Sequence, residues 1–328
     1  MRAAVTRARD PRPGRSGRVG PARKGRPEKF RQEEPLTVTV FIHLTDLHIG
    51  DPALGIPAPG EYDFKKAIEI GDPRPLTDTS TRLSMALEKI AAMDADPSFI
   101  VVTGDLSNYG ELVSYQALKG LMDPVTLPIV YTLGNHDDPA HAAEGLLGRA
   151  DDDALWDSDQ VIDGVHIIAL DTSVPGRVGG ALAEAQFRYL AEALGRFPDL
   201  PKLLMIHHPP AMGNDTPEYD LGAEDSQKLG DTIRGSGVRA ILCGHIHQSR
   251  VTVWHGIPVV VTAGLHAAID PLAPQGTQRV NSGAAVAVCT LDDQVFSVNY
   301  VSLPVDVVDL LEITDAQIAE YEATLEGA

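Results

Sequence analysis

Two kinds of apolar pattern alternate along the chain. Short runs of β-branched and apolar residues stop at turn-forming residues and predict strands, whereas longer segments repeat apolar residues at the spacing of a helix. The predicted strands cover residues 37–44, 99–103, 127–133, 202–206 and 238–243. The predicted helices between them cover residues 83–93, 182–194 and 225–233. Strands that alternate with helices indicate an α/β sheet, whose ligands gather beyond the carboxyl ends of the strands.

Each predicted strand is followed by residues that can bind a metal ion. The five motifs are Asp46-Leu47-His48, Gly104-Asp105, Gly134-Asn135-His136-Asp137, His207-His208 and Gly244-His245-Ile246-His247. Because the motifs follow strands of one sheet, we expect them to meet at one edge. Their carboxylate, amide and imidazole groups are too numerous for a single ion, and such mixed ligands suit Mn, Fe, Zn or Co. Two ions about 3.5–4 Å apart, bridged by one carboxylate, are therefore predicted.

The motifs differ in how strongly each one predicts a metal. Gly104-Asp105 by itself is typical of a turn, and Asn135 by itself is typical of an Asx turn. His245 and His247 are stronger candidates, because residues i and i+2 of an extended segment point to the same side. The prediction of a metal centre depends on the ordered set of all five.

Taken in order, the motifs match the pattern D-x-H, G-D, G-N-H-D/E, H and G-H-x-H. In this pattern the chain resembles the calcineurin-like metallophosphoesterases, over residues 38–303. The resemblance implies an α/β sandwich of two mixed β-sheets flanked by helices (αββα). That fold also accommodates four strand-like runs that do not alternate with helices, at residues 251–255, 258–262, 284–290 and 295–303. The implied ligands are Asp46, His48 and His247 for the first metal, Asn135, His207 and His245 for the second, and Asp105 as the bridge.

The resemblance also implies that His136 lies near the leaving group without binding metal. Two divalent ions would screen the phosphoryl oxygens and lower the pKa of a shared water. The departing alkoxide then needs a proton, which an imidazole with a pKa near ~6.5 can supply. We assign this role to His136, oriented by Asp137 or by a backbone group. His136 and Asp137 are thus the predicted catalytic residues.

Two other histidines have predicted roles, and a third is left without one. His208 is expected to point away from His207, because side chains alternate along a strand, and to pack or hydrogen-bond to a ligand residue. His43 lies inside the first predicted strand and is expected to be a core residue. His266 follows a strand at a position suited to lining the cleft, and no role is assigned to it.

The residues after the second motif separate the subfamilies. Protein Ser/Thr phosphatases of this fold continue the motif as G-D-x-x-D-R-G, whereas residues 104–110 read GDLSNYG and lack the arginine that binds a phosphomonoester dianion. Purple acid phosphatases place a tyrosine where Asn108 stands. Residues 134–137, 207–210 and 256–258 instead resemble the class III cyclic nucleotide phosphodiesterases and the glycerophosphodiesterases.

This resemblance implies a phosphoric diester hydrolase whose expected substrates are 3′,5′-cyclic nucleotides, cAMP in particular. Hydrolysis of glycerophosphodiesters, or of generic phosphodiesters and phosphonate monoesters, stays open, as does a non-catalytic metal-binding scaffold. A diester carries one negative charge, which two metals can neutralise without an arginine clamp. Residues 211–225 and 265–282 are rich in Gly, Pro, Asn and Asp, and are predicted to be loops that set substrate selectivity.

Length and cysteine content agree with one enzyme domain in a reducing compartment. Residues 36–304 suffice for one α/β core. Cys243 and Cys289 both lie in apolar runs and indicate no disulfide framework. No apolar stretch is long enough to span a bilayer. A cytoplasmic protein is therefore predicted, with a homodimer as the expected assembly.

The two ends differ from the rest of the chain. Residues 1–35 carry eleven Lys or Arg against four Asp or Glu, about +7, and their Arg, Pro and Gly content predicts a disordered basic tail. The other residues carry about −26, which gives the net charge of −19. An acidic body repels duplex nucleic acid, so a small diester substrate and no stable nucleic-acid partner are expected. Residues 305–328 are predicted to be an acidic helical extension packed on the same domain.

Overall fold

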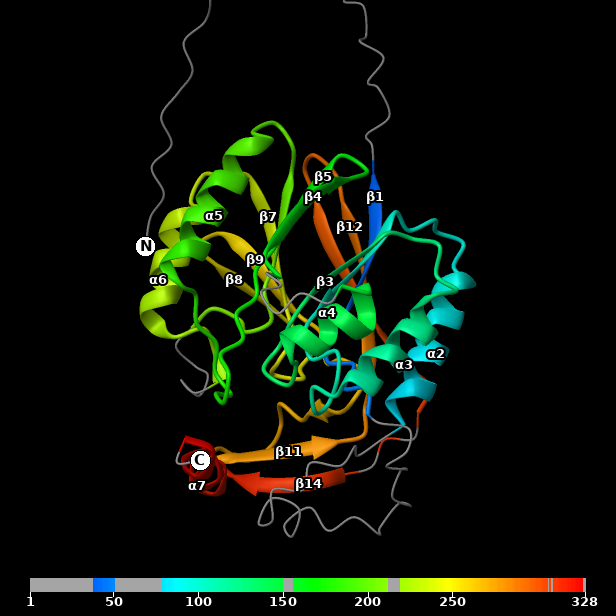
Figure 1. The fold of residues 1–328 in the computed structure, drawn as a ribbon, viewed down its shortest axis with the longest axis vertical. Coiled ribbons are helices and arrows are strands. Elements are labelled where there is room, and N and C mark those ends of the chain that lie inside the picture. The colour runs from blue at the N-terminus through cyan, green and yellow to red at the C-terminus, as the bar shows by residue number, and fades with distance from the viewer. Residues whose placement is uncertain are drawn as a thin grey trace, which may run out of the picture. The chain divides into compact units, whose positions relative to one another are not determined.

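The computed structural model describes residues 38–50, 78–149, 156–211, 219–305, 307 and 309–326. The predicted basic tail, residues 1–35, lies outside them. Residues 37–328 belong to one compact unit. Within this unit, two large β-sheets lie face to face with helices outside them (Figure 1).

The first sheet has the first three predicted strands at its centre and edge. β1 (Thr39–Leu44), β2 (Phe99–Thr103) and β3 (Ile129–Thr132) run parallel. β12 (Ala285–Leu291) pairs antiparallel with β1, and β13 (Phe296–Ser302) pairs antiparallel with β12. The sheet is therefore mixed, in the order β13-β12-β1-β2-β3, and its parallel strands end at one edge.

The second sheet has six strands in the order β4-β5-β6-β7-β9-β8. Its four inner strands run parallel, and the two edge strands are antiparallel to their neighbours. Its strands are β4 (Ser158–Ile162), β5 (Val165–Ala169), β6 (Lys202–Met205), β7 (Val238–Cys243), β8 (Arg250–Trp254) and β9 (Ile257–Val261). The sequence patterns name β6 to β9 but not β4 and β5.

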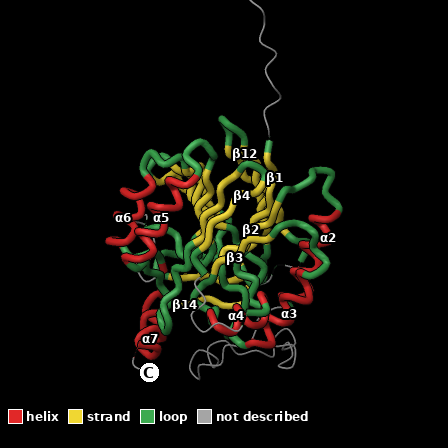
Figure 2. Tube along the Cα trace, turned by 45° about the horizontal axis from the view of Figure 1, so that its top comes forward, coloured by secondary structure: helices red, strands yellow, loops and turns green. Residues whose placement is uncertain are grey.

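Helices cover the outer faces of both sheets. α2 (Thr79–Ala91), α3 (Leu112–Met122) and α4 (Pro139–Leu147) pack on the first sheet. α5 (Glu184–Arg196) and α6 (Ala223–Ile233) pack on the second. Figure 2 shows α5 and α6 in red on one side of the yellow strands and α2 and α3 on the other. The predicted αββα sandwich is confirmed.

Apolar side chains fill the space between the two sheets. Phe41 of β1 stacks on Phe99 of β2, with ring centroids 4.9 Å apart. Both belong to a buried cluster that also contains Met205 and Leu242 of the second sheet. Full burial of each such side chain stabilises the fold by about 1.5–3 kcal/mol. This core fixes the strand ends from which the metal motifs emerge.

A third, small sheet lies where the sequence predicts loops and a helix. It consists of β10 (Ala268–Ile269), β11 (Thr277–Asn281) and β14 (Asp309–Thr314). The structure thus differs from the predicted helical extension, which is helical only in α7 (Asp315–Glu326). Residues 265–282 likewise include two strands. The physical reason is pairing between β11 and β14, a long-range contact that outweighs local propensity.

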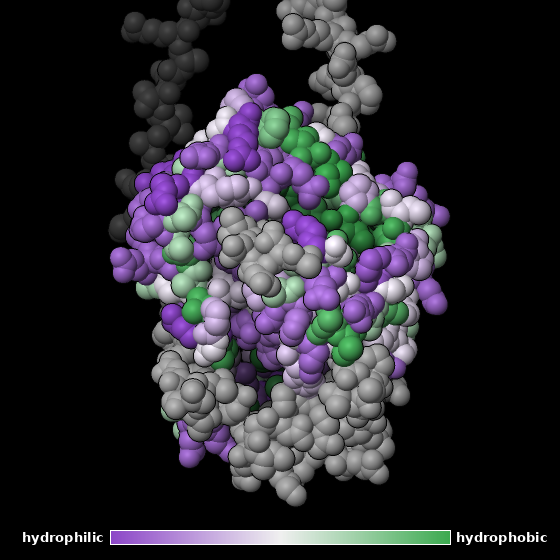
Figure 3. All heavy atoms as spheres, in the orientation of Figure 1, coloured by the Kyte–Doolittle hydropathy of each residue, from purple (hydrophilic) through white to green (hydrophobic). Residues whose placement is uncertain are grey.

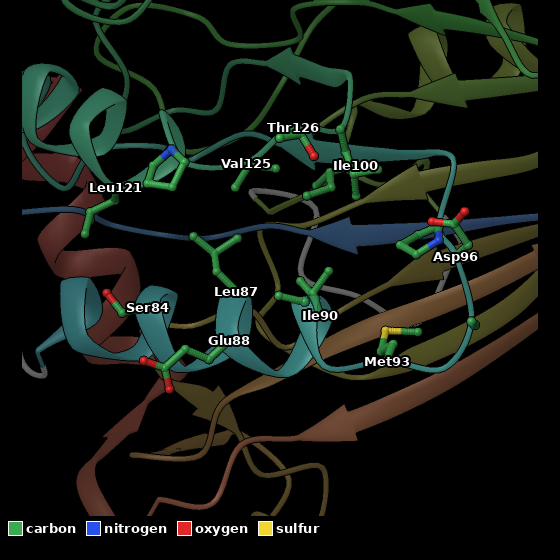
Figure 4. Close-up of a pocket in the computed structure, with 15 residues that line it drawn as sticks. Ser84, Leu87, Glu88, Ile90, Met93, Asp96, Ile100, Leu121, Val125 and Thr126 are labelled. Carbon is green, nitrogen blue, oxygen red and sulfur yellow. The ribbon is translucent and has the colours of Figure 1, made fainter.

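A cavity of about 560 Å³ opens beside α2 (Figure 4). Leu87 and Ile90 line it from α2, and Leu121 and Val125 line it from the opposite side. Asp96, which also lines it, precedes β2, and Val125 precedes β3. The cavity therefore lies at the amino ends of these strands, whereas the metal motifs follow the carboxyl ends.

The outer face of the layer formed by α5 and α6 is polar. Hydrophilic residues, purple in Figure 3, predominate over α5 and α6 at the upper left of that view. α6 has Glu224 and Asp225 in its first turn, where the helix dipole favours negative charge. No helix among the described residues has the length and apolar character needed to cross a membrane.

Candidate metal centre

The predicted ligands lie in the turns that follow five strands, at one edge of the sandwich. Two of these strands belong to the second sheet and three to the first. Asp46 and His48 follow β1, Asp105 follows β2, Asn135 follows β3, His207 follows β6, and His245 and His247 follow β7. The fold therefore delivers ligands to this edge from both sheets.

Asp105 lies between two groups of candidate ligands. In the first group, the ligand atoms of Asp46, His48, Asp105 and His247 lie within 4.8 Å of one another. Oδ2 of Asp105 is 3.4 Å from Nε2 of His48 and 3.3 Å from Nε2 of His207, which belongs to the second group. Nε2 of His247 is 3.3 Å from Oδ1 of Asp46. One carboxylate thus approaches imidazoles that come from both sheets.

The second group consists of His207, His208 and His245, whose ligand atoms also lie within 4.8 Å of one another. His208 differs from the other two because both its ring nitrogens have protein partners. Nδ1 lies 2.7 Å from the hydroxyl of Thr172, and Nε2 lies 2.9 Å from the carbonyl oxygen of Val178. Burial lowers the pKa of His208 to about 3. A neutral, fully hydrogen-bonded His208 agrees with the packing role predicted for it. The expectation that it points away from His207 is wrong, because the two rings lie 4.9 Å apart after β6 has ended.

Three candidate ligand rings are oriented through their Nδ1 atoms. A ring that donates a hydrogen bond from Nδ1 keeps the lone pair of Nε2 for a metal ion. The acceptors are Oδ1 of Asn108 for His48 at 2.9 Å, the carbonyl oxygen of Thr103 for His207 at 2.7 Å, and that of Ala267 for His247 at 2.9 Å. In each of the three rings, Nε2 is the atom close to a carboxylate.

Four of the predicted ligands have a buried polar atom without a hydrogen-bond partner among the described residues. The atoms are Nε2 of His48, His207 and His245, and Oδ1 of Asn135. A buried polar atom without a partner costs about 1–3 kcal/mol. Imidazole nitrogen and amide oxygen both donate lone pairs to transition metals. The orphaned atoms, together with the carboxylates of Asp46 and Asp105, therefore fit a pair of metal ions.

The backbone at five candidate ligands lies in the left-handed region. The φ angle is 49° at Asp46, 44° at His48, 49° at Asp105, 70° at His245 and 48° at His247. For residues other than glycine this conformation costs about 1–3 kcal/mol each. Backbone hydrogen bonds hold it in place, such as the 2.9 Å bond from the His48 N–H to the Asp105 carbonyl oxygen. The strain is thus concentrated where the chain aims these side chains at the cleft.

Two motif glycines allow the ligands to approach one another. A Cβ at Gly134 would collide with the carboxylate of Asp105 and lie 2.7 Å from Nε2 of His207. A Cβ at Gly244 would lie 2.6 Å from Oδ2 of Asp46. The glycines of G-N-H-D and G-H-x-H are therefore required by close packing around the ligands.

Asp105 and His207 shift each other's pKa. Burial by itself would raise the pKa of Asp105, but the adjacent imidazoles of His207, His136 and His48 outweigh it and hold this pKa well below its usual range. Burial would lower the pKa of His207, but the negative charge of Asp105, 3.3 Å away, raises it to about 9. The site therefore favours positive charge beside Asp105, carried by a proton or by a metal ion.

His136 is exposed at the rim of the cleft. Its Nδ1 lies 2.9 Å from the carbonyl oxygen of Asn108, and its backbone N–H donates to Oδ1 of Asp105 at 3.0 Å. Its ring meets that of His48 edge-on, with centroids 4.7 Å apart. Because Nδ1 donates to a carbonyl oxygen, Nε2 is the ring nitrogen that remains for other groups. A backbone group therefore orients this ring.

The Asp137 carboxylate bonds to groups other than the His136 ring. Its carboxylate accepts hydrogen bonds of 3.0–3.1 Å from the backbone N–H groups of Leu106, Ser107 and Gly134, and one of 3.0 Å from the hydroxyl of Tyr115. Burial, with the negative charge of Asp105, raises the pKa of Asp137 to about 6. Of the two groups predicted to orient His136, the backbone carbonyl does so, and Asp137 joins the turns after β2 and β3.

The remaining histidines near this edge have distinct surroundings. His43 is fully buried, with Nε2 2.8 Å from the hydroxyl of Thr103 and Nδ1 3.2 Å from that of Thr262. Burial lowers the pKa of His43 to about 3. This confirms the predicted core histidine. The ring of His266 lies 4.5 Å from that of His48, so His266 does lie beside the metal centre.

Sequence reasoning missed Arg82, a buried arginine on α2. Its guanidinium donates to the carbonyl oxygens of Leu265 and His266 at 2.8 Å and to that of Ser282 at 2.6 Å. The segment 265–282 that it holds also contains the carbonyl that orients His247. No sequence signal marks Arg82, because its partners lie almost 200 residues away in the chain.

Comparison with known proteins agrees with this geometry. Residues 39–249, more than half of the chain, match the family described as calcineurin-like phosphoesterase. The chain belongs to this family. Members of the calcineurin-like phosphoesterase family have a dinuclear metal centre, and the two ligand groups that meet at Asp105 are the candidates for it here.

Two curated relatives are similar over most of their length. A cAMP/cGMP dual specificity phosphodiesterase of Mycobacterium tuberculosis is 34% identical, over 77% of this chain and 75% of its own. A probable cyclic nucleotide phosphodiesterase of Rhodococcus erythropolis is 34% identical, over 77% and 79%. A dimetal phosphatase from Danio rerio shares the fold, with a TM-score of 0.57, 12% identity, and coverage of 84% of this chain and 98% of its own.

Proposed function

We propose that this calcineurin-like phosphoesterase is a two-metal phosphodiesterase that hydrolyses 3′,5′-cyclic nucleotides, cAMP in particular. The observation that carries the proposal is the position of Asp105 between two groups of metal-binding side chains from different sheets. Its similarity to a cAMP/cGMP phosphodiesterase supports the choice of substrate.

The proposed ligands divide between two ions of Mn, Fe, Zn or Co. Each set combines imidazole nitrogen with oxygen, the mixture that such ions accept. Asp46, His48 and His247 would hold the first ion, Asn135, His207 and His245 would hold the second, and Asp105 would be shared between them. His208 stays outside both sets because Thr172 and Val178 occupy its ring nitrogens.

When bound, the two ions supply charge neutralisation at the phosphoryl group and a water-derived nucleophile at neutral pH. The chain supplies the remaining parts. Asp105 has one oxygen engaged by the His136 N–H and turns the other towards the imidazoles. His136, whose Nδ1 is held by Asn108, donates the proton from Nε2 to the departing oxygen. The net reaction adds water across one ester bond and yields a nucleoside monophosphate.

Two arginines that could clamp a phosphomonoester are engaged by other groups of the protein. A monoester dianion needs an additional cationic clamp, whereas a diester monoanion does not. Arg82 is occupied by three backbone carbonyls. Arg279 is 3.2 Å from Asp270 and 3.0 Å from Glu312. Neither arginine is available as a clamp.

The charge of the chain and its thiols support the expected kind of partner and the expected cellular location. The acidic body favours a small diester and disfavours a nucleic-acid partner. Cys243 and Cys289 are buried free thiols, which suits a cytoplasmic protein. A homodimer stays a prediction, which light scattering of the purified protein tests.

A substrate panel tests the proposed function. The purified chain, reloaded with Mn²⁺ after chelation, is assayed on cAMP, cGMP, glycerophosphocholine and p-nitrophenyl phosphate, with Asp105→Asn as the matched inactive variant. The proposal predicts that a cyclic nucleotide has the highest kcat/KM. A higher kcat/KM for glycerophosphocholine would identify a glycerophosphodiesterase instead. A folded, metal-loaded protein that hydrolyses none of these substrates would indicate a scaffold.

A further inference from the structure

A second cavity, of about 270 Å³, adjoins the metal centre at His245. We call it the base cavity. Its wall continues from the last metal motif into β10, β11 and the turn between them. The aromatic and polar side chains that line it include Tyr219, His245, Gln248, Asp270, Gln275 and Gln278.

The base cavity shares its wall with the metal site through short connections. His245 lines the cavity and is also a candidate ligand. Ile269, another lining residue, donates from its N–H to the carbonyl oxygen of His247 at 2.9 Å. In a 3′,5′-cyclic nucleotide the phosphate is fused to the ribose, so the base lies one sugar away from the phosphorus. A phosphate at the metals therefore places the base in an adjoining cavity.

The chemistry of the lining suits a planar, uncharged heterocycle. Tyr219 provides an aromatic ring, 5.8 Å from the ring of His245, and aromatic rings stack on nucleobases. The three glutamines, Gln248, Gln275 and Gln278, each carry both a donor and an acceptor. Asp270 is the one carboxylate among the described residues of the wall, and Arg279 pairs with it at 3.2 Å. The cavity thus offers stacking and neutral hydrogen bonds.

Resting on the proposed function, we propose that the base cavity binds the nucleobase of a cyclic nucleotide, with Tyr219 stacking on the ring and Gln248 and Gln278 bonding its edge. Gln278 belongs to β11 and is held by pairing with Ile313 of β14. A glutamine amide presents its donor and acceptor in either order after a half-turn, so it matches adenine and guanine equally well. The cavity therefore accepts guanine as well as adenine, so cGMP is expected as a second substrate beside cAMP.

The first test measures how much the base contributes to kcat/KM, apart from the cyclic phosphate. The Mn²⁺-loaded protein is assayed on cAMP and on 1-O-methylribose 3′,5′-cyclic phosphate, which lacks a base. The wild type is expected to prefer cAMP by about tenfold or more in kcat/KM, the scale of one base stack. Tyr219→Ala is expected to bring this ratio close to one through a higher KM for cAMP. Its remaining activity on the base-free analogue shows that the variant is folded and metal-loaded.

The second test measures how the glutamines distinguish guanine from adenine. Gln278→Glu and Gln248→Glu replace an amide that donates and accepts by a carboxylate that only accepts. Guanine presents N–H donors on that edge, whereas adenine N1 is an acceptor, so the ratio of kcat/KM for cGMP over cAMP is expected to rise about tenfold. Gln294→Glu, at the turn between β12 and β13, is the matched control and leaves this ratio unchanged.

The outcomes distinguish this proposal from the proposed function. Equal wild-type kcat/KM for cAMP and the base-free analogue would overturn the base cavity while the phosphodiesterase stands. An unchanged ratio in both Tyr219→Ala and the glutamate variants would do the same. If the metal-loaded wild type hydrolyses no cyclic phosphate at all, both the base cavity and the proposed function are overturned.

Discussion

The guanidinium of Arg82 on α2 donates a 2.8 Å hydrogen bond to the carbonyl oxygen of Leu265, which lies 183 residues later in the chain. The same group holds the carbonyls of His266 and Ser282, so both ends of the segment 265–282 are attached to α2. This segment orients His247 through Ala267 and forms a wall of the base cavity. One buried arginine therefore joins the helix layer to the metal centre and to the substrate side of the cleft.

Replacing Arg82 by Met is expected to lower the free energy of unfolding by about 2–4 kcal/mol, because buried carbonyls lose their donor. It is also expected to raise KM for cAMP, because the wall of the base cavity loosens. Urea unfolding and steady-state kinetics measure the two effects. The matched control is Arg239→Met, which removes a guanidinium that donates to the Asp293 carbonyl on the surface. Equal stability of the two variants would contradict the assignment.

Gly134→Ala tests the close approach around Asp105. The new Cβ collides with the Asp105 carboxylate and with Nε2 of His207, so the variant is expected to lose two or more orders of magnitude in kcat/KM and to bind metal more weakly. Gly195→Ala in α5 is the control, because its Cβ meets open space and alanine stabilises a helix by about 0.5–1 kcal/mol. Metal titration and activity at saturating Mn²⁺ report the difference. Wild-type metal affinity in Gly134→Ala would contradict the geometry described for this site.

His136→Ala is expected to reduce kcat by about 10²–10⁴-fold, the usual effect of losing a general acid. Metal content should stay that of the wild type, because His136 is not among the proposed ligands. The control is His141→Ala, whose Nδ1 also meets a backbone carbonyl, that of Gly110 at 2.7 Å, but on α4 outside the proposed site. Stopped assays and elemental analysis on the same preparations check both statements. Turnover equal to that of the wild type would remove His136 from the mechanism.

Asp159, which lies outside the metal centre, is expected to make the stability of the fold depend on pH. Burial would raise its pKa, but hydrogen bonds from Tyr189 at 2.7 Å and His166 at 2.9 Å, with the charge of Arg196, hold this pKa below its usual value. Because the folded-state pKa is lowered, its stabilisation is present above the unfolded-state pKa of about 3.9 and is lost as pH falls through the lower folded value.

Asp159→Asn is therefore expected to be about 1–2 kcal/mol less stable than the wild type at pH 7, allowing for the exposed Arg196. The difference should shrink as the pH falls below about 4. Thermal unfolding across pH 2.5–7 measures it. Asp94→Asn changes an exposed carboxylate and serves as the control. A stability difference that is constant over this whole pH range would refute the role given to Asp159.

Much of the site follows from local patterns in the sequence. The strand before each motif is a dense apolar run, and the chain after it turns sharply, so Asp46, Asp105 and His245 are predicted at strand ends where the structure has them. These features depend on neighbours in sequence, which a pattern can reveal. His207 and His208, however, do not diverge as alternation along a strand predicts, because both lie in the bend after β6 and their rings are 4.9 Å apart.

Other features depend on contacts between distant segments. β11 becomes a strand because β14 pairs with it, and Arg82 is engaged because Leu265 and Ser282 fold against α2. Asp137 stands beside His136 in the motif, yet its carboxylate binds the backbone of the turn after β2. Neither hydrophobic period nor motif spacing contains this information.

The proposed function depends on Asp105 being shared between two metal ions. Crystals of the protein grown with Mn²⁺ and measured for anomalous scattering show whether it is. Two anomalous peaks are expected about 3.5–4 Å apart, one on each side of the Asp105 carboxylate, with His48 at one peak and His207 at the other. A single peak, or ions bound away from Asp105, would contradict the proposal.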